Sequence, residues 1–328
     1  MKFLFLLSLL ILSLQAKDYR SNPQTKEFIM MMAKEHNFKP SYLEKLFSNV
    51  KKQETPLSIM TRKPSKKPSK SLQKRYPAHG AWDRYKRYKV TPLRVKQGKE
   101  FLKKYRSAFD KAEKTYGVPA EYIVAIIGIE SVYGKNVGKY PVFDTLTTLA
   151  FEKNRRNKFF KNQLKKFIIL SYANKFDPKN VKGSYAGAIG LCQFMPSNYE
   201  PYGVDLNGDG HVRLQNPVDA IGSVANYLKL NGWRRGELVA TRVAYDGNRF
   251  TKYKTGYDKK YSRISLVGIT PKHKWDYHGK VRLIKLSRAE YDELWYGAKN
   301  FYVITRYNHS AYYAMAVHQL AQGMKNGM

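Results

Sequence analysis

The sequence predicts a mainly α protein of the α+β class, with a helical core and a small inserted antiparallel β subdomain. Apolar residues recur at helical spacing over most of 93–230 and again over 310–324. Between 237 and 286 the composition turns to Tyr, Thr, Val and Gly, with short alternating stretches that are typical of antiparallel strands. These two observations place a sheet within an otherwise helical chain.

Individual elements follow from the same patterns. We expect helices over the segments with the strongest helical periodicity: 99–116, 119–133, 159–173, 219–230 and 310–324. Within the β subdomain we expect strands at 251–255 and 280–286. Before the core, 22–50 has helical periodicity interrupted by Pro40-Ser41, which predicts a short helical hairpin.

The first 16 residues have the pattern of a secretory signal peptide. Lys2 precedes an apolar run over 3–14, and Ala16 supplies a small residue for cleavage. The run is too short to anchor the chain in a bilayer, and no later stretch is long and apolar enough to do so. With no cysteine nearby to carry a lipid, we expect a soluble periplasmic protein that is not lipidated.

The rest of the chain falls into three parts by composition. Residues 17–60 form the N-terminal helical segment, and 61–77 are rich in Pro, Ser and Lys, which predicts an exposed basic linker. Residues 78–328 form the main domain, and its β subdomain covers 237–286.

The net charge indicates an acidic partner. Lys and Arg number 60 against 25 Asp and Glu, which gives a formal charge of +35. Nucleic acid, anionic lipid and cell-wall polymers all meet that requirement, but export argues against nucleic acid and favours peptidoglycan with its peptide carboxylates. Cys192 stands alone, so no internal disulfide can form, and seven His with one Cys offer no zinc cluster.

Glu130 is the first candidate for chemistry. It shares a helix face with Ile126 and Ile127, so its carboxyl group stands on an apolar stripe. Burial there would raise its pKa and keep it protonated near neutral pH, as a general acid for glycosidic cleavage requires. The alternatives are a buried structural carboxylate paired with Arg155 or Arg156 and a helix-end residue exposed by fraying.

A second candidate segment is SYAGAIGLCQFMPS at 184–197. Small residues let a backbone approach a ligand closely, and Ser184 and Gln193 add side-chain hydrogen bonds beside it. The alternative is a tight contact between two helices, which small residues also favour.

Three motifs in order resemble the lytic murein transglycosylase B family over about 80–320. They are ESVYG at 130–134, GAIGLCQFMPS at 187–197, and YNHS at 307–310 followed by YAMAV at 313–317. The resemblance implies a core like that of goose-type lysozyme, with Glu130 as the sole catalytic acid and base and no organic cofactor. It also implies a sugar cleft lined by Tyr85, Arg155, Arg156, Ser184, Gln193, Tyr307, Asn308 and Tyr313. The arginines suit peptide-stem carboxylates, although they can equally form a solvated basic helix edge.

The family resemblance further implies lytic cleavage of the bond between N-acetylmuramic acid (MurNAc) and N-acetylglucosamine (GlcNAc). Glu130 would protonate the glycosidic oxygen, the substrate acetamido group would assist, and the muramoyl 6-hydroxyl would close a 1,6-anhydro ring. A hydrolytic muramidase remains an alternative, with Asp144 or Asp177 as a second carboxylate to activate water. A non-catalytic peptidoglycan-binding scaffold is a further alternative, and a secreted nucleic-acid binder ranks last.

The stretch DLNGDGH at 205–211 resembles the start of an EF-hand loop. The twelfth position is Asn216 instead of glutamate, and the family pattern places the last carboxylate slightly later. We expect a Ca²⁺ or Na⁺ site of modest affinity over a bare Asx-rich turn, with these ligands: Asp205, Asn207, Asp209, His211 through its carbonyl, and Asp219.

Overall fold

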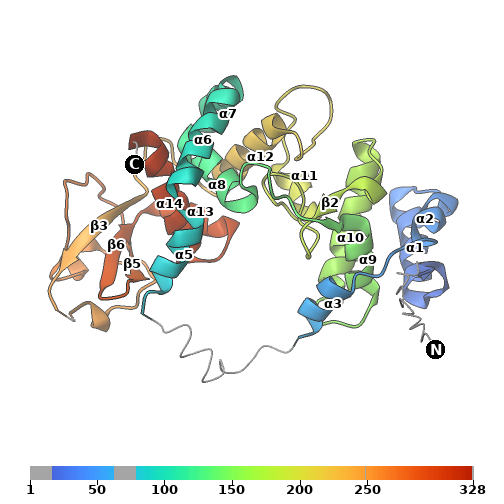
Figure 1. The fold of residues 1–328 in the computed structure, drawn as a ribbon, viewed down its shortest axis with the longest axis horizontal. Coiled ribbons are helices and arrows are strands. Elements are labelled where there is room, and N and C mark those ends of the chain that lie inside the picture. The colour runs from blue at the N-terminus through green and yellow to red at the C-terminus, as the bar shows by residue number, and fades with distance from the viewer. Residues whose placement is uncertain (1–16, 63–78, 248, 327–328) are drawn as a thin grey trace, which may run out of the picture. The chain divides into compact units, whose positions relative to one another are not determined.

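The computed structural model describes residues 17–62, 79–247 and 249–326 (Figure 1). The chain forms two compact units, the first from Met1–Arg62 and Lys139–Ala188 and the second from 63–138 and 189–328. This division differs from the predicted one, because the middle of the chain packs with the N-terminal helices. The predicted signal peptide and residues 63–77 of the predicted linker lie outside the described residues.

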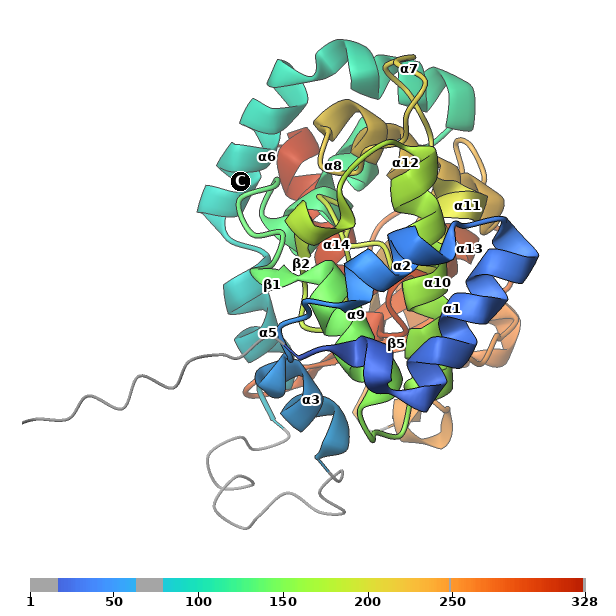
Figure 2. The ribbon, with the colours of Figure 1, turned by 90° about the vertical axis from the view of Figure 1, so that its right-hand side faces the viewer.

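The first unit is built on two helices, α9 (Val142–Phe151) and α10 (Asn157–Ala173), which pack against each other (Figures 1 and 2). The predicted N-terminal hairpin is confirmed by α1 (Pro23–His36) and α2 (Pro40–Phe47). Asn22 caps α1 by accepting from the backbone N–H of Gln24, and Asn37 ends it in the left-handed conformation. Edge-to-face contacts of Phe28 and Phe47 with Phe151 join the hairpin to α9.

Three short elements complete this unit. They are the 3₁₀ turn η1 (Tyr19–Ser21), α3 (Glu54–Thr61) and η2 (Pro178–Asn180). A two-stranded antiparallel sheet pairs β1 (Tyr140–Pro141) with β2 (Lys182–Gly183). Because these strands lie at the two ends of 139–188, their pairing closes that segment into one body.

The second unit is organised around α8 (Ala120–Ser131). The helices that pack most extensively against it are α6 (Pro92–Lys104), α7 (Arg106–Tyr116), α12 (Pro217–Leu230) and α14 (Ala311–Asn326). Every residue from Tyr122 to Ile129 is buried, so α8 is apolar on all sides, as a central helix must be. The single apolar stripe predicted for this helix was therefore only part of its buried surface.

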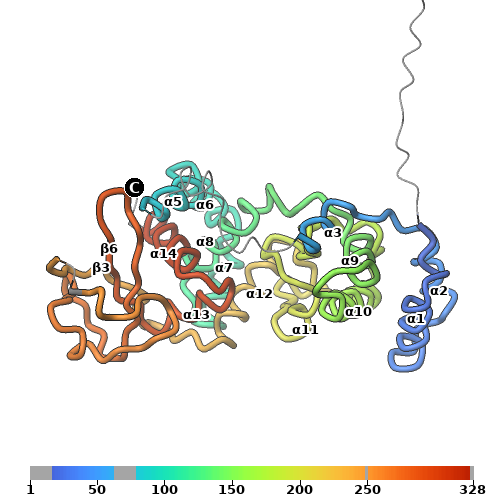
Figure 3. The backbone as a smooth tube through the Cα atoms, turned by 90° about the horizontal axis from the view of Figure 1, so that it is seen from below, coloured from blue at the N-terminus to red at the C-terminus, as the bar shows by residue number. Residues whose placement is uncertain are grey.

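Other elements of the second unit are short. They are α5 (Ala81–Lys89), η3 (Pro196–Asn198), α11 (Tyr199–Tyr202), η4 (Arg249–Lys252), η5 (Arg263–Ser265) and α13 (Lys299–Tyr307). In Figure 3, α13 and α14 lie close to each other near the end of the chain, as their mutual contacts also indicate.

The predicted β subdomain is confirmed as an antiparallel sheet with the strand order β4-β3-β6-β5. The strands are β3 (Ala240–Tyr245), β4 (Ile269–Pro271), β5 (Arg282–Ser287) and β6 (Asp292–Gly297). Figure 3 shows β3 and β6 side by side, as their register requires. The sheet extends to Gly297, beyond the predicted end at 286, and its inner face buries a cluster that includes Val243, Leu283 and Tyr296.

Three predicted elements differ from the structure. The strand expected at 251–255 was wrong, because this region forms η4 and buries Phe250 in the apolar cluster of the sheet. The single helix expected over 99–116 is broken at Tyr105, whose φ of −112° and ψ of 30° end α6 and precede α7. Pro119 is the N-cap of α8, one residue before the helix begins.

Candidate active site

Glu130 lies in the last turn of α8, at a sharp reversal of the chain. Val132 and Tyr133 both have positive φ, 52° and 58°, which is uncommon for residues with a Cβ. The Tyr133 hydroxyl donates to the carbonyl of Arg94 at 2.7 Å, so its ring is fixed beneath the helix. A Cβ at Gly128 would lie 2.6 Å from that ring, so this position needs glycine. The reversal holds Glu130 at the helix end.

The Glu130 carboxyl group combines burial with access. The residue is partly exposed, and its Oε1 accepts a hydrogen bond of 2.7 Å from the hydroxyl of Tyr313. Burial raises the pKa of Glu130, while the Tyr313 hydrogen bond and the Lys89 ammonium act in the opposite direction. The result is a carboxyl group with a raised pKa, which suits a proton donor.

Two stacked tyrosines support this carboxyl group. The rings of Tyr307 and Tyr313 lie 6.2 Å apart at an interplanar angle of 12°. Burial raises the pKa of both phenols well above the ordinary value, so both remain protonated and Tyr313 stays a donor to Glu130. The Tyr307 hydroxyl donates to the carbonyl of Cys192 at 2.6 Å.

The segment 189–197 is a tight loop, which corrects the alternative of a contact between two helices. Ile189 and Phe194 form an antiparallel bridge, and Gln193 has a φ of 51° at the turn between them. The Gln193 amide nitrogen donates to the carbonyls of Gly190 at 2.9 Å and Val137 at 3.0 Å. Its side chain therefore joins this loop to the one that follows α8.

Hydrogen bonds connect all three motifs into one cluster within the second unit. The Ser131 hydroxyl donates to the carbonyl of Leu191 at 2.7 Å and so joins the first motif to the second. Tyr307 joins the third motif to the second, and Tyr313 joins the third to the first. The residues that carried the family resemblance thus surround one carboxyl group.

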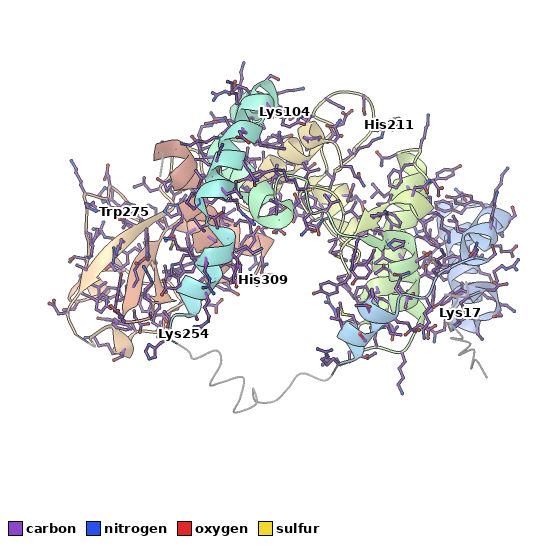
Figure 4. All side chains as sticks on the ribbon, in the orientation of Figure 1. Lys17, Lys104, His211, Lys254, Trp275 and His309 are labelled. Carbon is purple, nitrogen blue, oxygen red and sulfur yellow. The ribbon has the colours of Figure 1, made fainter. Side chains whose placement is uncertain are left out.

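Tyr85 and Asn308 lie in the same unit. Tyr85 is half-buried on α5, with its ring 6.1 Å from that of Trp82. Burial raises the pKa of its phenol, and the Glu130 carboxylate adds to that increase, so the two groups interact electrostatically. Asn308 is exposed at the end of α13, next to His309, which Figure 4 labels.

The remaining predicted sugar-binding residues belong to the first unit. The Ser184 hydroxyl accepts from the backbone N–H groups of Ala186 and Ala188, which fixes a tight turn. Arg155 is exposed and donates to the carbonyl of Arg62 at 3.0 Å. The exposed Arg156 guanidinium lies over the ring of Phe159.

Sequence reasoning missed two residues of this site. Lys89 acts on the charge of Glu130 and donates to the carbonyl of Ile129 at 3.3 Å. Its position four residues after Tyr85 puts both on one face of α5, which was the available signal. Ser131 lay inside a quoted motif, but its hydrogen bond to Leu191 spans 60 residues and has no local signature.

In the predicted cation loop, two carboxylates accept hydrogen bonds from the backbone of the loop. Asp205 accepts from the backbone N–H groups of Gly208, Asp209 and Gly210. Asp219 is buried at the start of α12 and accepts from three backbone N–H groups, including that of Arg213 at 2.9 Å.

The donor set of this loop suits a hard cation. Burial raises the pKa of Asp219, three backbone N–H groups lower it, and the charge of Asp205 adds a smaller increase that a bound cation would relieve. The other predicted ligands are an amide, an exposed carboxylate and a carbonyl, from Asn207, Asp209 and His211. Within the described ranges, no three His, Cys, Asp or Glu side chains gather as a metal cluster.

Known proteins resemble this chain over nearly its whole length. Residues 20–322 match the family described as the transglycosylase SLT domain. The chain belongs to this family. It is 40% identical over 309 residues to the membrane-bound lytic murein transglycosylase B of Escherichia coli (strain K12), which covers 94% of this chain and 84% of that protein.

Solved structures agree with this assignment. The E. coli lytic transglycosylase Slt35, solved in complex with bulgecin A, superposes with a TM-score of 0.84 at 39% identity and covers 95% of each chain. Slt35 has also been solved in complex with calcium. SltB3 from Pseudomonas aeruginosa, in complex with NAG-anhNAM-pentapeptide, has a TM-score of 0.76 at 26% identity and covers 93% of this chain and 79% of its own.

These matches confirm the predicted family, the predicted lysozyme-like, mostly helical fold and the predicted enzyme class. The protein is a lytic murein transglycosylase, a lyase that cleaves peptidoglycan.

Replacing Tyr313 by Phe should shift the pH dependence of cleavage. The Tyr313 hydrogen bond lowers the pKa of Glu130, so its loss raises that pKa further. An acid at Glu130 would work only while protonated, so activity would be lost as pH rises through its pKa, and the falling limb of kcat/KM should move to higher pH in Tyr313→Phe. Tyr307→Phe is the matched control, since that phenol donates to Cys192, and its limb should stay in place.

Proposed function

We propose that this transglycosylase cleaves the MurNAc–GlcNAc bond with Glu130 as its sole acid and base, and that it leaves 1,6-anhydro-MurNAc ends. The supporting observation is the Glu130 carboxyl group, which has a pKa raised by burial and accepts a hydrogen bond from Tyr313. Both properties fit a group that must first give a proton and then take one back.

One residue can both donate and recover the proton that this reaction needs. Glu130 gives its proton to the glycosidic oxygen as the bond to the anomeric carbon breaks, and the substrate acetamido oxygen assists by holding that carbon. The Glu130 carboxylate, stabilised by the Tyr313 hydroxyl, then accepts the proton of the muramoyl 6-hydroxyl as this oxygen attacks. The acid is regenerated, and no water is consumed.

Local structure disfavours the hydrolytic alternative. A muramidase would need a second free carboxylate, such as Asp144 or Asp177. Asp144 is buried, accepts from the backbone N–H of Lys51 at 3.1 Å and pairs with Lys179 at 3.5 Å. Asp177 accepts from the N–H of Lys179 as the cap of η2. Both carboxylates make structural contacts within the first unit. The mass of the released products distinguishes lytic cleavage from hydrolysis directly.

We further propose roles for the residues that would bind the glycan. Tyr85, Gln193, Tyr307, Asn308 and Tyr313 would contact the sugars beside Glu130, since they belong to the same unit. Ser184 would donate to or accept from the glycan strand. Arg155 and Arg156 would bind peptide-stem carboxylates, for which guanidinium groups are well shaped.

The loop at 205–219 would hold a structural Ca²⁺ or Na⁺ ion. Asp205, Asn207 and Asp209 would supply side-chain oxygens and His211 its carbonyl, with Asp219 as the last carboxylate. A cation there would neutralise the opposed charges of Asp205 and Asp219 and stiffen the loop before α12. Slt35, a relative, has been solved with calcium, and the same class of ion is proposed here.

Calcium should therefore stabilise the protein against heat. After EDTA treatment, adding Ca²⁺ should raise Tm, because the ion binds only the folded loop. Asp205→Ala should abolish that increase. Asp110→Ala, which removes an exposed aspartate on α7, should retain it. Equal Tm values with Ca²⁺ and with EDTA would show that the loop is an Asx-rich turn that binds no cation.

We also propose that residues 1–16 direct export to the periplasm and are then removed. The apolar run over 3–14 supports this. No helix in the described part of the chain is long and apolar enough to cross a membrane. The intact mass of the exported protein should correspond to a chain that begins near Lys17. A mass that retains Met1 would contradict cleavage.

A further inference from the structure

A cavity of about 900 Å³ lies in the second unit, and the residues that line it do not include Glu130. Its walls come from β3, β6, the start of α8, the second half of α14 and the chain over 233–239. Figure 4 labels Trp275, one of the lining residues, beside the sheet. Tyr122 lines the cavity and lies eight residues before Glu130 on α8, a rise of about 12 Å.

Several large aromatic rings line this cavity. Of the four tryptophans in the sequence, three line it: Trp233, Trp275 and Trp295. The Tyr122 ring lies 5.1 Å from that of Trp233. Such a concentration of indole faces is characteristic of a binding pocket for a ligand with flat apolar surfaces.

Polar atoms in the same walls have no partner. Four buried side-chain atoms among the lining residues make no hydrogen bond within the described residues: Trp233 Nε1, Trp275 Nε1, Glu237 Oε1 and Gln319 Oε1. Each such atom costs about 1–3 kcal/mol unless something in the cavity satisfies it. Two are donors and two are acceptors, so the complementary ligand both accepts and donates.

Both acidic side chains of the cavity are already paired, and Glu237 lies 3.5 Å from the Arg234 guanidinium. Glu293 accepts from Arg288 at 2.8 Å and from the Trp295 indole at 2.7 Å, and Arg288 also pairs with Asp83. Burial lowers the pKa of His318 to about 4, so its ring, which contacts the Tyr122 hydroxyl, is neutral at pH 7. Lys86 and Lys325 also line the cavity, so its walls carry more positive than negative charge.

We propose that this cavity is a second glycan-binding site, which takes an N-acetylated saccharide of about disaccharide size. Pyranose rings present apolar C–H faces to the indoles, and their hydroxyl and acetamido groups both donate and accept. A purely apolar ligand would leave all four polar atoms unpaired. The volume lies within the range of about 300–1,000 Å³ that is usual for small-ligand sites.

The proposal rests on the proposed function, because that function makes wall glycan the available saccharide. A second site would hold one stretch of glycan while Glu130 acts on another. The protein would then stay on the wall between successive cuts, and its effective affinity for a polymer would exceed that of either site alone.

Indole N–H resonances can test this proposal in the full chain with Glu130→Gln, which prevents cleavage. The probe is a tetramer of β-1,4-linked N-acetylglucosamine, followed in ¹H–¹⁵N spectra. Trp233 and Trp275 should shift on saccharide binding, since their N–H groups lack partners. Trp82 lies against Tyr85 outside the cavity, so it reports separately on the proposed catalytic cleft.

The two sites can therefore fail independently. A shift of Trp82 alone would overturn the cavity proposal and leave the proposed function intact. Shifts of Trp233 and Trp275 alone would support the cavity and contradict the proposed cleft. If an isolated stem peptide moves these two resonances and the saccharide does not, the cavity proposal is wrong.

A variant pair locates the binding further. Gln319→Ala removes one unpaired acceptor and should weaken the response of Trp233 and Trp275 at least about 10-fold, on the scale of one lost polar contact. Tyr88→Ala removes an exposed ring on α5 that does not line the cavity, and it should leave the response unchanged. An unchanged response in folded Gln319→Ala would contradict the proposal. The titration of the Glu130→Gln chain itself needs no cavity variant, so a misfolded one would not remove the test.

Discussion

Replacing Glu130 by Gln should lower the rate of glycan cleavage at least about 100-fold, the scale expected for losing a general acid. The amide keeps the shape of the carboxyl group and can still accept from Tyr313, but it has no proton to give. Release of soluble fragments from purified sacculi measures the effect, and sacculus binding should persist. Glu121→Gln, the same change in the first turn of α8, should retain activity.

The fold of this variant should be at least as stable as that of the wild type. Burial raises the pKa of Glu130, so its charge opposes folding once pH exceeds the ordinary carboxyl range. At neutral pH, Glu130→Gln should therefore have an equal or higher Tm. The difference should vanish at acid pH, where the wild-type group is protonated in both states. If the Tm of Glu130→Gln were lower than that of the wild type at neutral pH, its lost activity would be explained by unfolding.

Products separate lysis from hydrolysis. Wild-type fragments should end in 1,6-anhydro-MurNAc, should be lighter than muramidase products by one water, and should resist borohydride because the anomeric carbon is internally bonded. Products with reducing ends would establish hydrolysis, which requires a second carboxylate to activate water. Activity of Glu130→Gln above about a hundredth of the wild-type rate would remove Glu130 from the role of sole acid.

Gly190→Ala should lower the free energy of unfolding by about 3 kcal/mol or more. Gly190 has a φ of +73°, and a Cβ there would lie 2.3 Å from the carbonyl oxygen of Leu214. Because that atom belongs to the backbone, no side-chain rotation relieves the clash. Thermal and denaturant unfolding of the purified variant measure the loss.

Gly236→Ala separates this clash from backbone strain. Gly236 has nearly the same φ, +72°, but a Cβ there meets nothing within 4 Å. It should cost about 1–2 kcal/mol, the penalty for a left-handed residue alone. Equal losses in the two variants would show that Leu214 moves aside and that the loop is less tightly packed than its backbone indicates.

Local patterns predicted the elements that depend on local sequence. The proline at the start of α2 and the periodicity of α10 and α12 gave their positions to within a few residues. The same reasoning missed the break at Tyr105, where the apolar spacing continues although the backbone turns. It also placed Glu130 on a single apolar stripe of its helix. The sequence alone did not show that this helix is buried on every side, because that depends on the other helices that pack around it.

Long-range pairing explains the other differences. Residues 139–188 join the N-terminal helices through contacts such as that of the Tyr19 hydroxyl with Glu152, across 133 residues, and no short window of sequence contains both partners. Lys89 and Tyr313 reach Glu130 from two other helices, so only the motif order, compared with a known family, could indicate that these segments meet.

The hydrogen bonds around Glu130 connect residues that are 60, 115 and 183 positions apart. Contacts between residues so far apart in the sequence form only when the second unit has assembled. A partly opened molecule would expose the carboxyl group to water, and its pKa would fall back toward the ordinary range. If Glu130 is the acid as proposed, a misfolded or frayed copy of this enzyme would lose the raised pKa on which the proposed proton transfer depends.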